Sequence, residues 1–140
     1  MNPTYNLERF LTAQEPVYNT VLSELRNGKK QTHWMWFIFP QLKELGFSST
    51  AKFYGIADIN EARAYLQHPI LRQRLEECID VLMAGSISNP TRIFGYPDDL
   101  KFHSCLTLFF FADPENNYFK KALDKFYGGI GDFKTERIVL

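Results

Sequence analysis

The segment around residue 33 combines a titratable imidazole with large aromatic rings. His33 is followed by Trp34 and Trp36, and Lys29 and Lys30 precede it. A histidine beside two tryptophans can hold a planar ligand by stacking, and it can gain or lose a proton near neutral pH. The alternative is a core cluster of rings with His33 as its polar edge, because large aromatic residues often fill protein interiors.

A second polar cluster lies at residues 98–103, directly before a long apolar run. Asp98 and Lys101 are three residues apart, and Asp99 and His103 are four apart, so ion pairs within one helix would explain all of them. However, Lys101 and His103 enter a helix that is apolar on every side further along. A cation in the first turns of a helix opposes the helix dipole unless an anion lies beside it, and either the aspartates or a ligand would supply that anion.

Both clusters place polar groups at the entrance of an apolar run, where such groups need partners or solvent. A cavity shared by the two clusters would give these polar groups both hydrogen-bonding partners and access to solvent. We therefore expect His33, Trp36, Lys101 and His103 to approach one another. The complete set of candidate ligand-binding residues is His33, Trp34, Trp36, Arg92, Asp98, Lys101 and His103. No catalytic residue is assigned.

Two functional classes follow from this set. The first, which we favour slightly, is a small binding or interaction module whose aromatic and basic pocket takes a small anionic ligand or a protein partner. The second is a small enzyme acting on a nucleotide-like or ADP-ribose-like ligand. In that enzyme a tryptophan stacks on the base, Arg92 or a lysine meets phosphate, and a histidine or Asp98 transfers protons. The sequence holds no catalytic motif that decides between them.

Other motifs indicate structure rather than chemistry. Residues 128–132 (Gly-Gly-Ile-Gly-Asp) are glycine-rich, but they follow a helical segment and lack the Lys-Ser/Thr pair of a P-loop, so we interpret them as a helix end and a turn. The histidines at 33, 68 and 103 are too scattered, and the two cysteines too isolated, to predict a metal site. No cofactor is expected either.

Helix signals recur along the chain and predict the elements that position these groups. The clearest helix covers residues 69–84, where apolar residues recur at intervals of four and three. Six large apolar residues at 34–39 favour a helical turn over a buried strand. Further helices are expected at residues 6–13, 16–28, 58–67, 90–93, 97–111 and 114–126, with caps at Asn6, Asp58, Asn89 and Asp113.

The second half of the 97–111 segment is apolar on all sides, which marks a central, buried helix. The sequence thus predicts an all-α fold, a single domain over residues 1–140 with about six to eight short antiparallel helices around that central apolar helix. Its core should include Leu75, Ile79, Leu82, Leu108, Phe109, Leu123 and Phe126.

Composition indicates a folded chain and argues against nucleic acid as its partner. The 140 residues are 45% apolar and 16% aromatic, which provides a ring-rich core and excludes intrinsic disorder. Sixteen basic and sixteen acidic residues give no net charge, so the basic excess typical of nucleic-acid binding is absent.

The longest apolar run, residues 34–39, is too short to span a bilayer, and no basic segment followed by an apolar one opens the chain. We expect a soluble, cytoplasmic protein with Cys78 and Cys105 as buried thiols.

Several segments together resemble one bacterial family, domain of unknown function 1810. The longest is the run from Gly28 to Gln41, which contains His-Trp-Met-Trp-Phe-Ile-Phe-Pro-Gln, a string rich in rare residues. The resemblance implies an all-helical fold of antiparallel helices and brings no activity with it. Some members carry the label calpastatin, but nothing here resembles a disordered calpain-inhibitory repeat. The other matching segments are Leu45-Gly-Phe-Ser48, Tyr65-Leu-Gln-His-Pro69 with Leu71 and Leu75, Phe94-Gly95, Asp98, Lys101 and residues 104–109.

Overall fold

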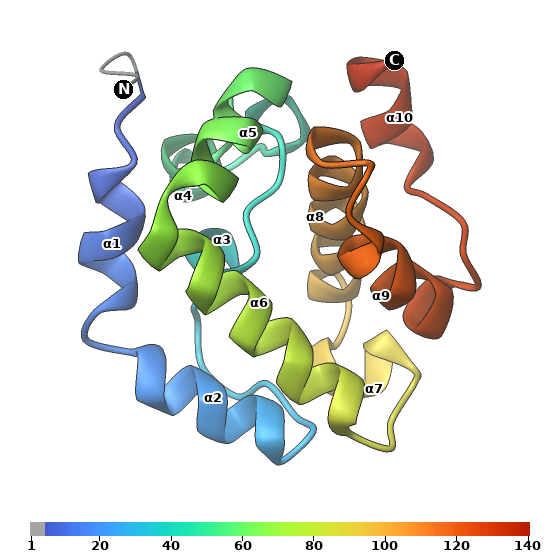
Figure 1. The fold of residues 1–140 in the computed structure, drawn as a ribbon. Coiled ribbons are helices and arrows are strands. Elements are labelled where there is room, and N and C mark those ends of the chain that lie inside the picture. The colour runs from blue at the N-terminus through green and yellow to red at the C-terminus, as the bar shows by residue number, and fades with distance from the viewer. Residues whose placement is uncertain (1–4) are drawn as a thin grey trace.

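In the computed structural model, which describes residues 5–140, the chain forms ten α-helices and one 3-10 helix (Figure 1). No strand occurs in this part of the chain, and one isolated parallel bridge joins Leu42 to Ile56. The all-α prediction is therefore confirmed. The helices are α1 (Glu8–Gln14), α2 (Tyr18–Arg26), α3 (Met35–Ile38), η1 (Lys43–Leu45, the 3-10 helix), α4 (Ser49–Tyr54), α5 (Ile59–Gln67), α6 (Pro69–Ala84), α7 (Pro90–Phe94), α8 (Asp98–Ala112), α9 (Asn117–Tyr127) and α10 (Phe133–Val139).

Residues 5–140 contain more helices than the six to eight expected, because short elements escape a periodicity argument. The α4 helix has only six residues, too few to display an apolar stripe. It begins at Ser48, whose side chain accepts a hydrogen bond from the backbone N–H of Ala51. The run at residues 34–39 does contain a helix, the four-residue α3, as favoured over a strand.

Capping residues set most of the helix starts. Asp58 and Asn89 cap α5 and α7 as predicted, each accepting a hydrogen bond from a backbone N–H of the first turn. The predicted cap at Asn6 is wrong, since no side chain caps α1. The predicted cap at Asp113 is also wrong. There the N–H of Asn116 donates to the carbonyl of Asp113 and closes a turn, so that α9 begins later with Asn116 as its cap.

The central helix of the fold is α8. It packs against α5, α7, α9 and α10, and Figure 1 shows it behind α9 and beside α10. Phe102 and Phe109 lie on it fully buried, each in contact with rings from other helices. This confirms the predicted central apolar helix. The seven residues predicted for the core are all buried: Leu75, Ile79, Leu82, Leu108, Phe109, Leu123 and Phe126.

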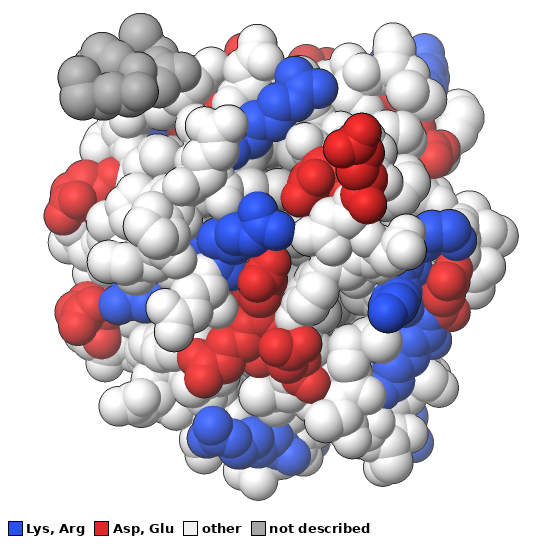
Figure 2. Space-filling model, in the orientation of Figure 1, with Lys and Arg blue, Asp and Glu red and all other residues white. Residues whose placement is uncertain are grey.

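The longest helix, α6, crosses the front of the molecule in Figure 1 and packs on α2, α5 and α9. Its outward side carries Glu76, Glu77 and Asp80, and Figure 2 shows acidic side chains gathered over this helix. Basic and acidic groups otherwise alternate across the face in Figure 2. Among the helices of residues 5–140, none has the length and apolar character needed to cross a bilayer.

Candidate functional site

A buried carboxylate organises the loop between α2 and α3. Glu24, on α2, is only 7% exposed. Its Oε1 accepts hydrogen bonds from the backbone N–H groups of Gln31 (2.7 Å) and Thr32 (3.1 Å) and from the indole N–H of Trp34 (2.9 Å). Its Oε2 accepts a bond from the Thr32 hydroxyl at 2.6 Å. One side chain therefore fixes the path of residues 31–34.

These donors also keep Glu24 ionised. Burial by itself would raise the pKa of the Glu24 carboxyl, but the hydrogen bonds from Thr32, Gln31 and Trp34 outweigh burial and lower the pKa to about 2. The loop is thus held by a charge that its own N–H and O–H groups satisfy.

The same loop carries Lys30 to the start of α8. The backbone N–H of Lys30 donates to the carbonyl of Ile93 at 2.7 Å, and its Nζ lies 2.9 Å from Oδ2 of Asp98. The second carboxylate oxygen of Asp98, Oδ1, lies 3.3 Å from Nζ of Lys101. Each ammonium also lies near an indole ring: Lys30 Nζ is 5.3 Å from the ring centroid of Trp34, and Lys101 Nζ is 5.4 Å from that of Trp36.

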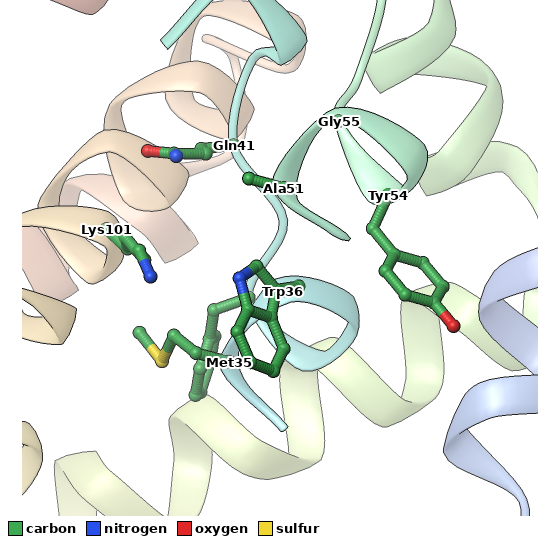
Figure 3. A pocket seen from close by; sticks show the side chains of 8 residues that line it. Met35, Trp36, Gln41, Ala51, Tyr54, Gly55 and Lys101 are labelled. Atoms are coloured by element: carbon green, nitrogen blue, oxygen red, sulfur yellow. The ribbon is translucent and has the colours of Figure 1, made fainter. Parts of the chain in front are cut away.

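A hollow lies between α3, α4 and α8, on the side of Lys101 that faces Trp36. Figure 3 shows Trp36 in its middle, with the Lys101 amino group turned toward Met35 and Trp36 and with Tyr54 on the far side. The space inside it that a water-sized sphere can occupy is about 10 Å³, roughly what one water molecule needs. Its walls are mainly apolar, and Lys101 is the charged residue among them. The lining residues are Met35, Trp36, Phe39, Gln41, Ala51, Tyr54, Gly55 and Lys101.

Asp98, Lys101 and Trp36, three of the candidate residues, are thus brought together. The Asp98–Lys101 contact is the intrahelical ion pair that the three-residue spacing predicts. Trp36, from a segment about 65 residues away in sequence, joins it through the ring contact with Lys101.

His103 lies on a different side of α8. Its ring stacks on Tyr127 with the centroids 3.9 Å apart, and its Nε2 donates to the carbonyl of Ile130 at 2.7 Å. The expected pair with Asp99 does not form, because Asp99 accepts a bond from the Thr91 hydroxyl instead. Residues two apart on a helix point in different directions, so Lys101 and His103 cannot face one cavity. His103 helps to fasten the 128–132 turn onto α8.

The remaining candidates lie outside the hollow. Trp34 is 1% exposed and offers no ring face to a ligand, as in the alternative of a core ring cluster. His33 and Arg92 are exposed, and within residues 5–140 no hydrogen bond, ion pair or ring contact joins either of them to Lys101 or Trp36. The expected approach of His33 to Lys101 therefore has no contact to support it. In the same part of the chain, no three His, Cys, Asp or Glu side chains cluster as metal ligands would.

Comparison with known proteins agrees with the family resemblance seen in the sequence. The family model described as "Protein of unknown function (DUF1810)" matches residues 4–139, nearly the whole chain. The chain belongs to this family. A solved structure, the conserved hypothetical protein Rv1873 from Mycobacterium tuberculosis, is 47% identical to this DUF1810 protein, and the match covers 96% of each chain with a TM-score of 0.93. A search of curated proteins finds no match.

Sequence reasoning missed several residues that shape the hollow of this DUF1810 protein. Glu24 left a signal, because it lies three residues after Val21 on the apolar stripe of α2, where a carboxylate needs buried partners. Tyr54 and Gln41 left none. They belong to α4 and to the connection before η1, which reach the hollow only through tertiary packing.

Proposed function

We propose that this protein is a binding module whose site is the mouth of the hollow between α3, α4 and α8, where Lys101 pairs with a compact anionic group of a small ligand or of a protein partner. The observation that carries the proposal is the position of Lys101. Its ammonium lies over Trp36 at the mouth of an apolar hollow and is shared with Asp98, which Lys30 also neutralises. An ammonium beside an aromatic wall is a means of holding an anion with an apolar body.

The volume of the hollow favours this class over the nucleotide-directed enzyme. Pockets for drug-sized ligands measure roughly 300–1,000 Å³. The space inside the hollow that a water-sized sphere can occupy is about 10 Å³, so neither a nucleotide nor an ADP-ribose fits within it. Of the histidines proposed for proton transfer, His103 is hydrogen-bonded to Ile130 on another side of α8, and His33 has no contact with Lys101 or Trp36 among residues 5–140. No specific observation favours the enzyme.

Two further parts of the proposal concern the partner of the protein and its location in the cell. Nucleic acid is not the proposed partner, since the sequence has no net charge and the face in Figure 2 mixes both signs. We place the protein in the cytoplasm. Support comes from Cys78 and Cys105, which are both free thiols, whereas small secreted domains generally use their cysteines in disulfides.

The test is a nuclear magnetic resonance titration of the labelled protein with acetate, benzoate, inorganic phosphate, phenyl phosphate and AMP. At least one compact anion should shift the amide signals of Trp36 and Lys101, and AMP should not. Lys101→Ala should remove that response. The matched control is Lys120→Ala, which also removes a lysine paired with an aspartate on a helix, here at 3.4 Å from Asp124, but far more exposed. If no compact anion shifts these signals, or if the response survives Lys101→Ala, the proposal is wrong.

A further inference from the structure

Two polar side chains at the mouth of the hollow have hydrogen-bond donors without an acceptor. Trp36 and Gln41 both line the hollow and are half-buried. Among residues 5–140, neither the Trp36 indole N–H nor the Gln41 side-chain amide donates to another group, and both are open to solvent because no unpaired polar side-chain atom is buried there. These donors can therefore take an acceptor from outside the protein.

The two donors and the Lys101 ammonium face one space. Figure 3 shows the indole nitrogen of Trp36, the amide of Gln41 and the amino group of Lys101 around it. Lys101 Nζ also lies 5.4 Å from the centroid of the Trp36 ring, so one small group can reach both residues. We propose, resting on the function proposed above, that the anionic group is a carboxylate, and that the Trp36 indole N–H and the Gln41 amide donate to it together with Lys101.

The protein already holds one of its own carboxylates in this way. Glu24 accepts the indole N–H of Trp34 at 2.9 Å, together with two backbone N–H groups and one hydroxyl. A carboxylate accepts so many donors because its two oxygens offer about four lone-pair sites. An ammonium, an indole N–H and an amide can therefore share one carboxylate at the mouth. Trp36 there presents the same donor that Trp34 gives to Glu24.

The charges around the mouth fit a monoanion. Lys30 lies 2.9 Å from Asp98 with its side chain 9% exposed, and Lys101 lies 3.3 Å from the other oxygen of Asp98 with its side chain 25% exposed. The more buried Lys30 can therefore neutralise Asp98 while Lys101 turns toward a ligand. One positive charge is then left, which one carboxylate balances. A phosphate monoester, with a charge of about −1.5 to −2 at neutral pH, exceeds it.

The size of the hollow limits how far the ligand enters. The space inside it that a water-sized sphere can occupy is about 10 Å³, so one oxygen of a carboxylate fits and the atoms that carry the carboxylate stay outside. The site thus recognises a projecting carboxylate. A small free acid and an aspartate or glutamate side chain of a protein partner both present that group.

The indole signals of the two tryptophans measure this contact directly, because each tryptophan gives one indole N–H signal in nuclear magnetic resonance spectra of the labelled protein. Sodium acetate replaces sodium chloride at constant ionic strength, and acetamide is the neutral analogue. Acetate should move the Trp36 indole signal downfield, and acetamide should not. The Trp34 signal is the internal control, since its N–H is already bonded to Glu24.

Three variants assign the donors. Trp36→Phe keeps an aromatic ring and removes the N–H, and it should weaken acetate binding, followed at the Lys101 amide signal, at least about fivefold. Lys101→Met keeps an apolar stem of similar length and should weaken the binding at least about tenfold. Tyr54→Phe is the matched control. It also removes one polar hydrogen from an aromatic residue that lines the hollow, and it should leave the affinity unchanged.

A second carboxylate distinguishes the two sources of the group. The blocked tripeptide acetyl-Gly-Glu-Gly-amide is titrated beside acetate, with the corresponding glutamine tripeptide as its neutral control. Both carboxylates should move the Trp36 indole signal. Tighter binding of the glutamate tripeptide assigns the carboxylate to a protein partner, and tighter binding of acetate assigns it to a free acid.

The outcomes separate this inference from the function on which it rests. An anion that shifts the Lys101 amide signal and leaves the Trp36 indole signal unmoved would overturn the inference alone. The inference would also be wrong if Trp36→Phe bound acetate as well as the wild type, if acetamide bound equally, or if methyl phosphate bound more tightly than acetate. If no compact anion shifts any of these signals, the inference and the proposed function both fail.

Discussion

Trp34 and Trp36 have different environments in this protein, and the Glu24 carboxylate determines which of the two rings is buried. Glu24 accepts the indole N–H of Trp34, together with two backbone N–H groups just before it. This bond allows the whole Trp34 ring to be buried, since its polar atom is satisfied inside the core. Trp36 has no such partner in the described residues and lies half-buried at the hollow.

We expect Glu24→Gln to lower the free energy of unfolding at neutral pH by about 2 kcal/mol, because hydrogen bonds to a charged acceptor become weaker and one or more donors lose their partner. Urea denaturation measures this change. Glu115→Gln, at an exposed position in the turn before α9, should change the free energy of unfolding by less than about 0.5 kcal/mol.

The pKa of Glu24 also predicts an effect of acid. Its value in the folded protein is about 2, below the ordinary 4.5. A lowered pKa stabilises the fold fully above pH 4.5, and this contribution is lost as the pH falls toward 2. The free energy of unfolding of the wild-type protein should therefore decrease more steeply over this range than that of Glu24→Gln. Parallel profiles for the two proteins would contradict the role given to the Glu24 charge.

Both thiols should be inert in the folded protein. Burial raises the pKa of Cys78 to about 12 and raises that of Cys105 as well, so neither forms the reactive thiolate near neutral pH. We expect dithionitrobenzoate at pH 8 to titrate two thiols per chain in denaturant and almost none within minutes in buffer. Rapid reaction of one thiol in the native protein would mean that α6 or α8 opens readily.

At the scale of the element, α8 shows how a helix can be buried nearly all round although it contains hydroxyl groups. Ser104 and Thr107 each donate to the backbone carbonyl four residues earlier, at 3.1 and 2.8 Å. The Thr107 hydroxyl also accepts a bond from the N–H of Asp132 at 2.8 Å, which fixes the start of α10. Satisfied polar groups thus allow α5, α7, α9 and α10 to pack on one helix.

We predict that Leu108→Ala lowers the free energy of unfolding by about 2–5 kcal/mol, because Leu108 is fully buried on α8 and its truncation leaves a cavity. Leu100→Ala is a control on the same helix at a position that is 50% exposed, and it should cost less than about 1 kcal/mol. Thermal or urea unfolding followed by circular dichroism compares the two. Equal stabilities for both variants would mean that α8 is not the centre of the core.

At the scale of the whole molecule, one arginine ties α1 to a distant part of the chain. Arg9 Nη2 donates to Glu61 at 3.0 Å and to the carbonyl of Gly55 at 2.9 Å, and its Nε donates to the carbonyl of Phe53 at 2.8 Å. The side chains of Arg9 and Glu61 are 9% and 3% exposed. Glu61 in turn accepts a bond from the backbone N–H of Ala57. Arg9 and Glu61 together therefore hold the connection between α4 and α5 against α1.

Arg9→Ala should lower the free energy of unfolding by about 3–5 kcal/mol, since it leaves the Glu61 carboxylate buried without its charge partner. Arg63→Ala, which removes an exposed arginine hydrogen-bonded to Asn60 on α5, should have almost no effect. Urea denaturation gives both values. Hydrogen exchange should also become faster in α1 of the Arg9 variant than elsewhere, and uniform exchange would contradict a role in anchoring that helix.

The sequence alone determined the local features of this protein. Periods of three and four residues located α6, Asp58 and Asn89 set the starts of α5 and α7, and a wholly apolar run identified the central helix α8. The Asp98–Lys101 pair also followed from spacing. Each of these features depends on residues within about one or two helical turns, and contacts of that range can be read from a linear pattern.

Only the tertiary structure decided which of the two tryptophans faces the hollow, which lysine pairs with Asp98 from outside its helix, and that His103 stacks on Tyr127. These contacts join segments that are roughly ten to seventy residues apart. A buried polar group pairs with whichever partner the packing of the helices brings near. A linear pattern contains no information about that neighbour. The candidate residues could therefore be named from the sequence, but their grouping around Trp36 and Lys101 required the packed fold.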